Sequence, residues 1–202
     1  GGGGGEAKDQ VRGSAGRAMP DTALTSVGEL PRLERLRLPL ASDALPRACM
    51  LRLSGAPDRA MGWDRAACML PLGGARAVDL VARNVLHTRE TFRVTMPLLF
   101  LHSPDTAADT IVHLEHRFPS LVPPQYHLLQ HRTPKVHASD LSPAAWPYEP
   151  AMEWGTAGDG ALYTALHDSG TLDSLLRENY RYMFVSDVAN LAASFDLKLL
   201  SW

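Results

Sequence analysis

Histidine side chains that stand close together in the sequence are the first candidates for chemistry in this chain. His113 and His116 are three residues apart, which would place them on one face of a helix, and His127 and His131 form a second close pair. Such pairs occur in zinc sites, but zinc normally takes at least three protein ligands, and the nearby sequence supplies no third one. We therefore interpret these histidines as surface or half-buried side chains.

Two other groups of side chains could act on a ligand or bind one. Asp159 and His167 could form an acid–base pair, but Asp159 stands between two glycines, and a Gly-Asp-Gly run is typical of a turn. Trp146, Tyr148 and Trp154 lie among prolines and could stack on a base or a sugar. The commoner arrangement for such a loop is packing against its own domain.

Short apolar runs alternate with helical periodicity from Ala48 onward, and these elements must position any site. The pattern predicts, in chain order, strand 48–53, helix 77–87, strand 96–101, helix 105–116, strand 126–130, helices 161–167 and 172–178, strand 182–186 and a helical end to 191–200. Strands that alternate with helices predict an α/β fold of three layers with a mainly parallel, Rossmann-like sheet. Ligands bind such sheets beyond the carboxyl ends of the strands, here in the loops after Leu53, Leu101, Gln130 and Ser186.

The first 47 residues differ from this pattern. Residues 1–20 open with five glycines and continue small and polar, which predicts a disordered tail or an added linker ahead of Met19. Residues 21–47 carry leucines at positions 30, 33, 36 and 38 with arginines between them, which predicts an N-terminal arm, either helical or extended. The α/β domain is expected over residues 48–202.

Composition excludes several classes of partner. The net charge is −2 and the arginines are scattered, so no strong field attracts nucleic acid or an acidic membrane. No apolar run is long enough to span a bilayer and no secretory signal is present, so we expect a cytoplasmic location. Cys49 and Cys68 are expected to be buried thiols in a reducing compartment. The apolar end 197–200 with Trp202 indicates a surface for a protein partner or a second copy, or a chain that continues further.

Five segments form an ordered series of motifs: 53–71, 98–110, 154–163, 169–173 and 182–191. In this order they resemble L-N-G-G-L-G-T-S-M-G-x-x-x-A-K-S, P-L-x-x-M-N-S-F-x-T-x-x-D-T, W-x-P-P-G-H-G-D-x-Y, S-G-x-L-D and Y-x-F-V-S-N-x-D-N-L. These are motifs of the UTP:glucose-1-phosphate uridylyltransferases, also called UDP-glucose pyrophosphorylases. The resemblance covers residues 48–200, about three-quarters of the chain. It implies the N-terminal, nucleotide-binding part of such an enzyme, with a nucleotidyltransferase sheet.

The resemblance implies a reaction in which an oxygen of a sugar 1-phosphate attacks the α-phosphorus of UTP and pyrophosphate leaves. Such catalysis depends on positioning and on neutralising phosphate charge, through loop amides, a cation and carboxylate-bound Mg²⁺. Gln130 matches the glutamine that faces uracil, and Asp187 is the remaining candidate for holding Mg²⁺. The nucleotide-binding positions that the resemblance implies are Gly55, Arg59, Gly62, Gln130, Gly158 and Gly160.

Other positions that carry the family's chemistry hold different residues here. Ala56 and Asp58 replace the two middle glycines of the loop, so a side chain and a negative charge stand where a triphosphate would lie. Ala67 stands at the lysine position, Ala189 at the position of the metal-binding aspartate, and Asp159 at that of the histidine. Losing a group that neutralises phosphate charge typically costs orders of magnitude in rate.

Three interpretations follow from these replacements. We favour a pseudoenzyme, which lacks efficient uridylyl transfer and binds a nucleotide, a sugar phosphate or a protein partner. The alternative is an active Mg²⁺-dependent nucleotidyltransferase that joins UTP or another NTP to a sugar 1-phosphate, with Asp187 in place of the lost aspartate and Arg59 or Arg65 in place of the lysine. A third is a different reaction in the same crevice, carried by Asp159, Asp187 and nearby histidines.

Overall fold

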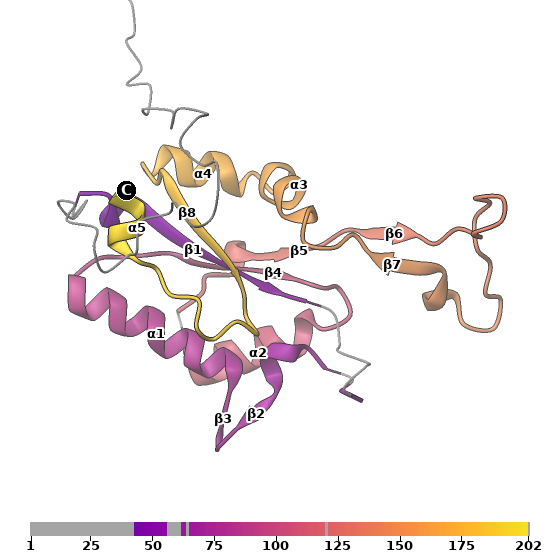
Figure 1. Ribbon diagram of the computed structural model, residues 1–202, viewed down its shortest axis with the longest axis horizontal. Helices are drawn as coiled ribbons and strands as arrows, with labels where there is room; N and C mark the ends of the chain where they lie inside the picture. Colours follow the sequence, from indigo (N-terminus) through magenta and orange to yellow (C-terminus); the bar gives the residue numbers. More distant parts are fainter. Residues whose placement is uncertain (1–42, 56–61, 64, 120, 202) are drawn as a thin grey trace, which may run out of the picture. The chain divides into compact units, whose positions relative to one another are not determined.

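A computed structural model describes residues 43–55, 62–63, 65–119 and 121–201 of the 202-residue chain (Figure 1). All of them belong to one compact unit, residues 38–202. The predicted tail 1–20 and most of the predicted arm 21–47 lie outside the described residues. The domain boundary at residue 48 therefore stays a prediction.

Four parallel strands form the central sheet, in the spatial order β5-β4-β1-β8. The strands are β1 (Ala48–Ser54), β4 (Leu98–His102), β5 (His127–Leu129) and β8 (Tyr182–Asp187). Every residue of β1 and β4 is buried, as expected for central strands that are covered on both faces. The four predicted strands are thus confirmed, each within two residues of its predicted ends.

Helices cover both faces of this sheet. Figure 1 shows α1 (Ala77–Phe92) and α2 (Ala107–Arg117) on one side, and α3 (Ala161–Asp168) and α4 (Thr171–Arg177) on the other. This arrangement is the three-layer α/β fold that the alternating pattern predicted. Gly170 separates α3 from α4 with φ +70°, a left-handed conformation that glycine adopts without strain.

The remaining elements are short. They are η3 (Leu45–Arg47), η5 (Ala67–Met69), β2 (Pro71–Leu72), β3 (Ala75–Arg76), η6 (Pro124–Tyr126), η7 (Pro150–Glu153) and α5 (Leu197–Ser201). The predicted C-terminal helix is therefore only five residues long. Helix α1, in contrast, continues five residues beyond its predicted end.

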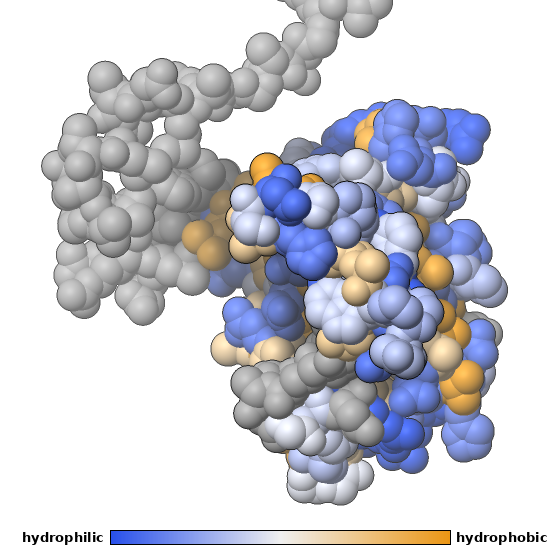
Figure 2. Space-filling view, turned by 90° about the vertical axis from the view of Figure 1, so that its right-hand side faces the viewer, coloured by the Kyte–Doolittle hydropathy of each residue, from blue (hydrophilic) through white to orange (hydrophobic). Residues whose placement is uncertain are grey.

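An antiparallel arm, β6 (Arg132–Pro134) with β7 (Trp154–Thr156), extends sideways from the sheet in Figure 1, and the sequence analysis did not predict it. Tyr148 in its distal part is fully exposed, so the expectation that this loop packs against the domain is wrong for that residue. Trp146 and Trp154 are about half-buried, and the Lys135 ammonium lies 5.8 Å from the centre of the Trp146 ring. On the face that Figure 2 shows, apolar groups of the described residues are scattered among polar ones.

The core is built from the central strands and the inner faces of the helices. Val78, Val81 and Val85 of α1 are buried at helical spacing, which confirms the predicted apolar face of this helix. Cys49 and Cys68 are buried and free, as predicted. In the part of the chain that the structure describes, no helix combines the length and the apolar character that crossing a membrane requires.

Candidate functional site

The carboxyl ends of the four strands meet at one edge of the sheet. Backbone hydrogen bonds continue past the strand ends, so the loops that follow them leave the sheet side by side. These bonds run from Ser103 N–H to the Ser54 carbonyl (3.2 Å), from Gln130 N–H to the His102 carbonyl (2.8 Å) and from Val188 N–H to the Leu53 carbonyl (3.0 Å). Three of the predicted site residues, Gly55, Gln130 and Asp187, therefore lie along this carboxyl edge.

The glycine-rich loop begins at this edge. The Gly55 carbonyl accepts a hydrogen bond from the Thr106 hydroxyl at 3.3 Å, which fixes the start of the loop against the start of α2. Gly62, at the far end, is exposed with φ +67°, where a larger side chain would be strained. Arg59 and the rest of residues 56–61 lie outside the described residues. The contact of Arg59 with phosphate thus stays a prediction.

The position of the family's lysine lies close to the same edge. Ala67 is half-buried and begins η5, and its neighbour Cys68 places its sulfur 3.3 Å from the Ser54 hydroxyl at the end of β1. Burial raises the pKa of the Cys68 thiol, and the negative charge of Asp187 contributes to the rise. Asp187 is therefore near η5, whose first residue, Ala67, carries a methyl group where the resemblance implies an ammonium.

Arg65 was one predicted substitute for that lysine. Its Nε lies 3.2 Å from a carboxylate oxygen of Asp109 in α2, and both side chains are about half-exposed. An exposed ion pair of this kind contributes little to stability and exchanges easily. The arginine is nevertheless directed at α2, where its charge is already balanced by Asp109.

Asp187 is the candidate metal ligand, and its carboxylate is partly used by its own turn. One oxygen accepts the backbone N–H of Ala189 at 2.6 Å, and the Asp187 carbonyl accepts the N–H of Asn190 at 3.2 Å. Among the described residues, no group of three histidine, cysteine, aspartate or glutamate side chains is arranged to hold a metal. Mg²⁺ is commonly held by one or two carboxylates together with phosphate oxygens. A single carboxylate does not form a Mg²⁺ site before the nucleotide binds.

Gln130 has a fixed place at the edge. Gln130 is only 4% exposed, and its backbone N–H is hydrogen-bonded to β4, so the sheet sets its position. Gly158 and Gly160 lie on a different element, at the entry to α3, and both are exposed. Gly158 has φ +77°, a conformation that glycine adopts without strain and that other residues rarely adopt. The turn that leads into α3 therefore depends on glycine at position 158.

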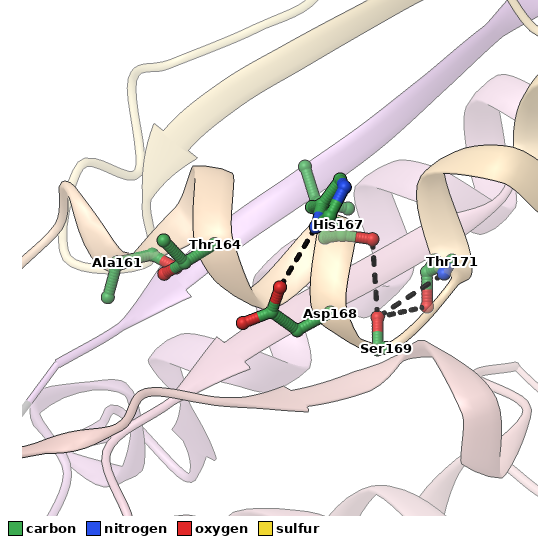
Figure 3. Close-up of polar contacts among 7 residues, drawn as sticks. Ala161, Thr164, His167, Asp168, Ser169 and Thr171 are labelled. Carbon is green, nitrogen blue, oxygen red and sulfur yellow. Dashed lines mark hydrogen bonds and ion pairs between the residues drawn. The ribbon is translucent and has the colours of Figure 1, made fainter.

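His113 and His167 each contact an aspartate carboxylate. His113 Nε2 lies 2.6 Å from the Asp79 carboxylate, which also accepts the N–H of Arg76 at 2.9 Å and so caps α1. Burial opposes ionisation of Asp79, but these hydrogen bonds outweigh it and hold the pKa of Asp79 below its usual value. His167 contacts Asp168 at 2.9 Å (Figure 3), while Asp159 lies in a turn, as its place between two glycines predicted.

Sequence reasoning missed the contact of the half-buried His127 with a buried histidine, and a buried arginine. His102 and His127, on adjacent strands, lie 2.9 Å apart between Nε2 and Nδ1 with their rings stacked. Arg52 is only 2% exposed in the middle of β1, donates to the Ser186 hydroxyl and, at 3.1 Å, to the Ala193 carbonyl. A polar residue within an apolar run, as in Leu51-Arg52-Leu53, is the signal that could have found the arginine.

A parallel sheet with its loops gathered at the carboxyl edge and helices on both faces defines a Rossmann-like nucleotidyltransferase fold. Comparison with solved structures agrees. A UDP-glucose pyrophosphorylase from Leishmania major has a TM-score of 0.80 and 33% identity, over 90% of this chain and 39% of that one. A mutant of the same enzyme, solved in complex with UDP-glucose, matches equally well.

Sequence comparisons identify the family. The family model described as UTP–glucose-1-phosphate uridylyltransferase matches residues 7–202. A probable enzyme of this name from Schizosaccharomyces pombe is 30% identical over 168 residues, and the Saccharomyces cerevisiae enzyme is 30% identical over 159 residues. These alignments cover 80% and 78% of this chain, and 32% of each relative. The chain belongs to the UTP–glucose-1-phosphate uridylyltransferase family, and it spans about a third of the length of these relatives.

Proposed function

We propose that the chain binds a uridine nucleotide or a UDP-sugar at the carboxyl edge of its sheet and does not carry out efficient uridylyl transfer. The observation that supports this most is the contrast between two parts of the edge. Gln130, which matches the base-facing glutamine, is buried and fixed by the sheet, whereas Ala67 and Ala189 stand at the positions of the cation and the metal-binding carboxylate.

A glutamine amide suits the recognition of uracil. It offers a carbonyl acceptor and an N–H donor side by side, and uracil presents an N–H beside a carbonyl. Phosphate, in contrast, needs cations or free amides. Of the described arginines near the edge, Arg65 is paired with Asp109 and Arg132 with Asp105 at 2.5 Å. Binding is therefore expected to depend mainly on the base and only weakly on the number of phosphates.

The compartment is part of the same proposal. We place the protein in the cytoplasm because Cys49 and Cys68 are both buried and free, which is usual for proteins of a reducing compartment.

Calorimetric titration with UDP, UDP-glucose and UTP, each with Mg²⁺ and with EDTA, tests the proposal. The three ligands should bind with similar affinity, and removal of Mg²⁺ should change the dissociation constant little. Gln130→Ala should weaken binding about tenfold, the effect of losing one or two ligand hydrogen bonds. Gln125→Ala, at an exposed position five residues earlier, is the matched control and should leave binding unchanged.

A coupled assay for pyrophosphate, with UTP, Mg²⁺ and glucose 1-phosphate, tests the catalytic half. The expected rate is at the background of the assay. Pyrophosphate release at a rate typical of enzymes, lost in Asp187→Asn, would support the active alternative instead. Absence of nucleotide binding in the wild-type chain would refute the proposal as a whole.

A further inference from the structure

A groove lies on the flank of the sheet, between edge strand β5 and the end of α3, and has a volume of about 590 Å³. Its strand wall includes Leu129, Gln130 and His131, and its helix wall includes Thr164, Asp168 and Thr171. Of these residues, only Gln130 belongs to the candidate nucleotide site. The β5–α3 groove is large enough for a ligand of two or three sugar rings.

The helix wall presents polar groups that the fold holds in place. The Ser169 hydroxyl donates to the Thr171 hydroxyl at 2.8 Å, and Thr171 in turn donates to the Gln125 carbonyl at 3.5 Å, which ties this wall to the strand wall. Figure 3 shows the Asp168 carboxylate directed towards His167, with one oxygen 2.9 Å from His167 Nδ1. Asp168 is exposed, so its second oxygen can accept a hydrogen bond from a ligand.

The strand wall adds backbone groups. The backbone N–H of Gln130 donates to β4. The backbone N–H and carbonyl groups of successive residues in a strand point to opposite sides, so those of Leu129 face away from β4. No further strand pairs with β5 among the described residues, which leaves this side of Leu129 open towards the groove. The Leu129 side chain is 53% exposed and provides an apolar surface next to these polar groups.

Charge decides which ligand this groove favours. Among the described residues that line it there is one carboxylate, from Asp168, and neither lysine nor arginine. A phosphate group would meet repulsion with no compensating cation. Hydroxyl groups, in contrast, can both donate and accept, and they match the carboxylate, hydroxyl, amide and backbone groups of the two walls.

We propose that the β5–α3 groove binds an uncharged saccharide, with Asp168, Thr164 and the open backbone groups of Leu129 hydrogen-bonded to its hydroxyls and the C–H face of a ring on the Leu129 side chain. This site is separate from the phosphate part of the nucleotide site, because it lies along the flank of the sheet and excludes anions. The saccharide therefore binds whether or not a nucleotide is present.

Saturation-transfer NMR with maltotriose, cellotriose and mannotriose as probes tests this proposal on the whole chain. At least one of the three should receive saturation, and the transfer should persist when UDP is added. Asp168→Asn should weaken that binding about tenfold, as expected for a hydrogen bond to a charged group. Asp173→Asn removes an exposed carboxylate of α4 outside the groove and should bind like the wild type.

Three results would overturn the proposal: none of the three probes binds, Asp168→Asn binds the probe as well as the wild type, or UDP displaces the probe. The last would place the saccharide in the nucleotide site. Because Asp168 is exposed, its replacement should not affect folding, and circular dichroism verifies this for each variant. Since the probes carry no nucleotide, failure of the proposed nucleotide binding leaves this test unchanged.

Discussion

Acid should destabilise this protein through the buried histidine pair of the central sheet. His102 is fully buried on β4, stacks on Phe100 and contacts His127 on β5. Burial lowers the pKa of His102 from 6.5 to about 3, and the neighbouring His127 adds to this effect. Protonation of His102 would place a positive charge in an apolar layer. The carboxylate that acts on the pair is that of Glu115, which raises the pKa of His127 against the larger, lowering effect of burial.

The sign and size of the effect follow from this shift. His102 binds its proton with a pKa of 6.5 in the unfolded chain and of about 3 in the folded chain. Its contribution to stability is therefore present above pH 6.5 and is lost progressively as the pH falls towards 3. One pKa unit corresponds to about 1.4 kcal/mol. Between pH 8 and pH 5, His102 alone should therefore lower the free energy of unfolding by about 2 kcal/mol.

Urea unfolding at pH 8 and pH 5, followed by far-ultraviolet circular dichroism, measures this difference. With a urea slope of roughly 2 kcal/mol per molar, the wild-type midpoint should fall by about 1 M. His102→Asn removes the titrating group and leaves an amide, so its midpoint should fall by much less between the two pH values. His137→Asn, which removes an exposed histidine of the arm, should behave like the wild type. If His102→Asn and the wild type lose the same stability on acidification, the buried pair is not the cause and the reasoning is refuted.

Two further predictions concern the stability of the fold. Arg52→Ala should lower the free energy of unfolding by about 3 kcal/mol, since it leaves a cavity and two unpaired acceptors, while Arg83→Ala on the exposed side of α1 should change it by less than about 0.5 kcal/mol. Gly170→Ala should lower the free energy of unfolding, measured by thermal unfolding, by about 1 kcal/mol because φ is +70°, although the space for a Cβ is open. Gly160→Ala, with φ −60°, should leave this free energy unchanged or raise it. Equal effects of the two glycine replacements would show that backbone conformation is not what Gly170 provides.

The central sheet was predictable because its strands are buried on both faces. Such strands read as continuous apolar runs, as in 98–101, and the runs alternate with the helical spacing of Val78, Val81 and Val85. The β6–β7 arm was not predictable on these grounds. Its strands are three residues long and none of their residues is buried, so neither burial nor alternation leaves a pattern in the sequence.

The sequence predicted the position of site residues that directly follow a strand. It did not predict which side chains form ion pairs with one another. Gln130 and Asp187 lie at the carboxyl edge because β5 and β8 end there. The parallel direction of the strands places these two ends at the same edge. The pairing of Arg65 with Asp109, 44 positions later in the sequence, depends on how η5 meets α2, which no local pattern encodes. The same holds for His167, which contacts the residue next to it and not Asp159.

The two positions at which the resemblance implies a lysine and an aspartate, Ala67 and Ala189, are ones that the fold itself does not constrain. Ala189 is exposed and Ala67 is half-buried beside the edge, so neither side chain supports the core. A lysine and an aspartate at these two positions could extend into solvent or towards a bound phosphate without displacing a packed group. Under the proposed function, absence of the two charges therefore needs no compensating change in the sheet, and the fold is compatible with either set of residues. For the same reason, the double variant Ala67→Lys with Ala189→Asp should fold as stably as the wild type, within about 1 kcal/mol. Any pyrophosphate release that it gains from UTP, Mg²⁺ and glucose 1-phosphate would then measure the contribution of these two groups alone. If it folds and gains none, residues other than these two limit the chemistry.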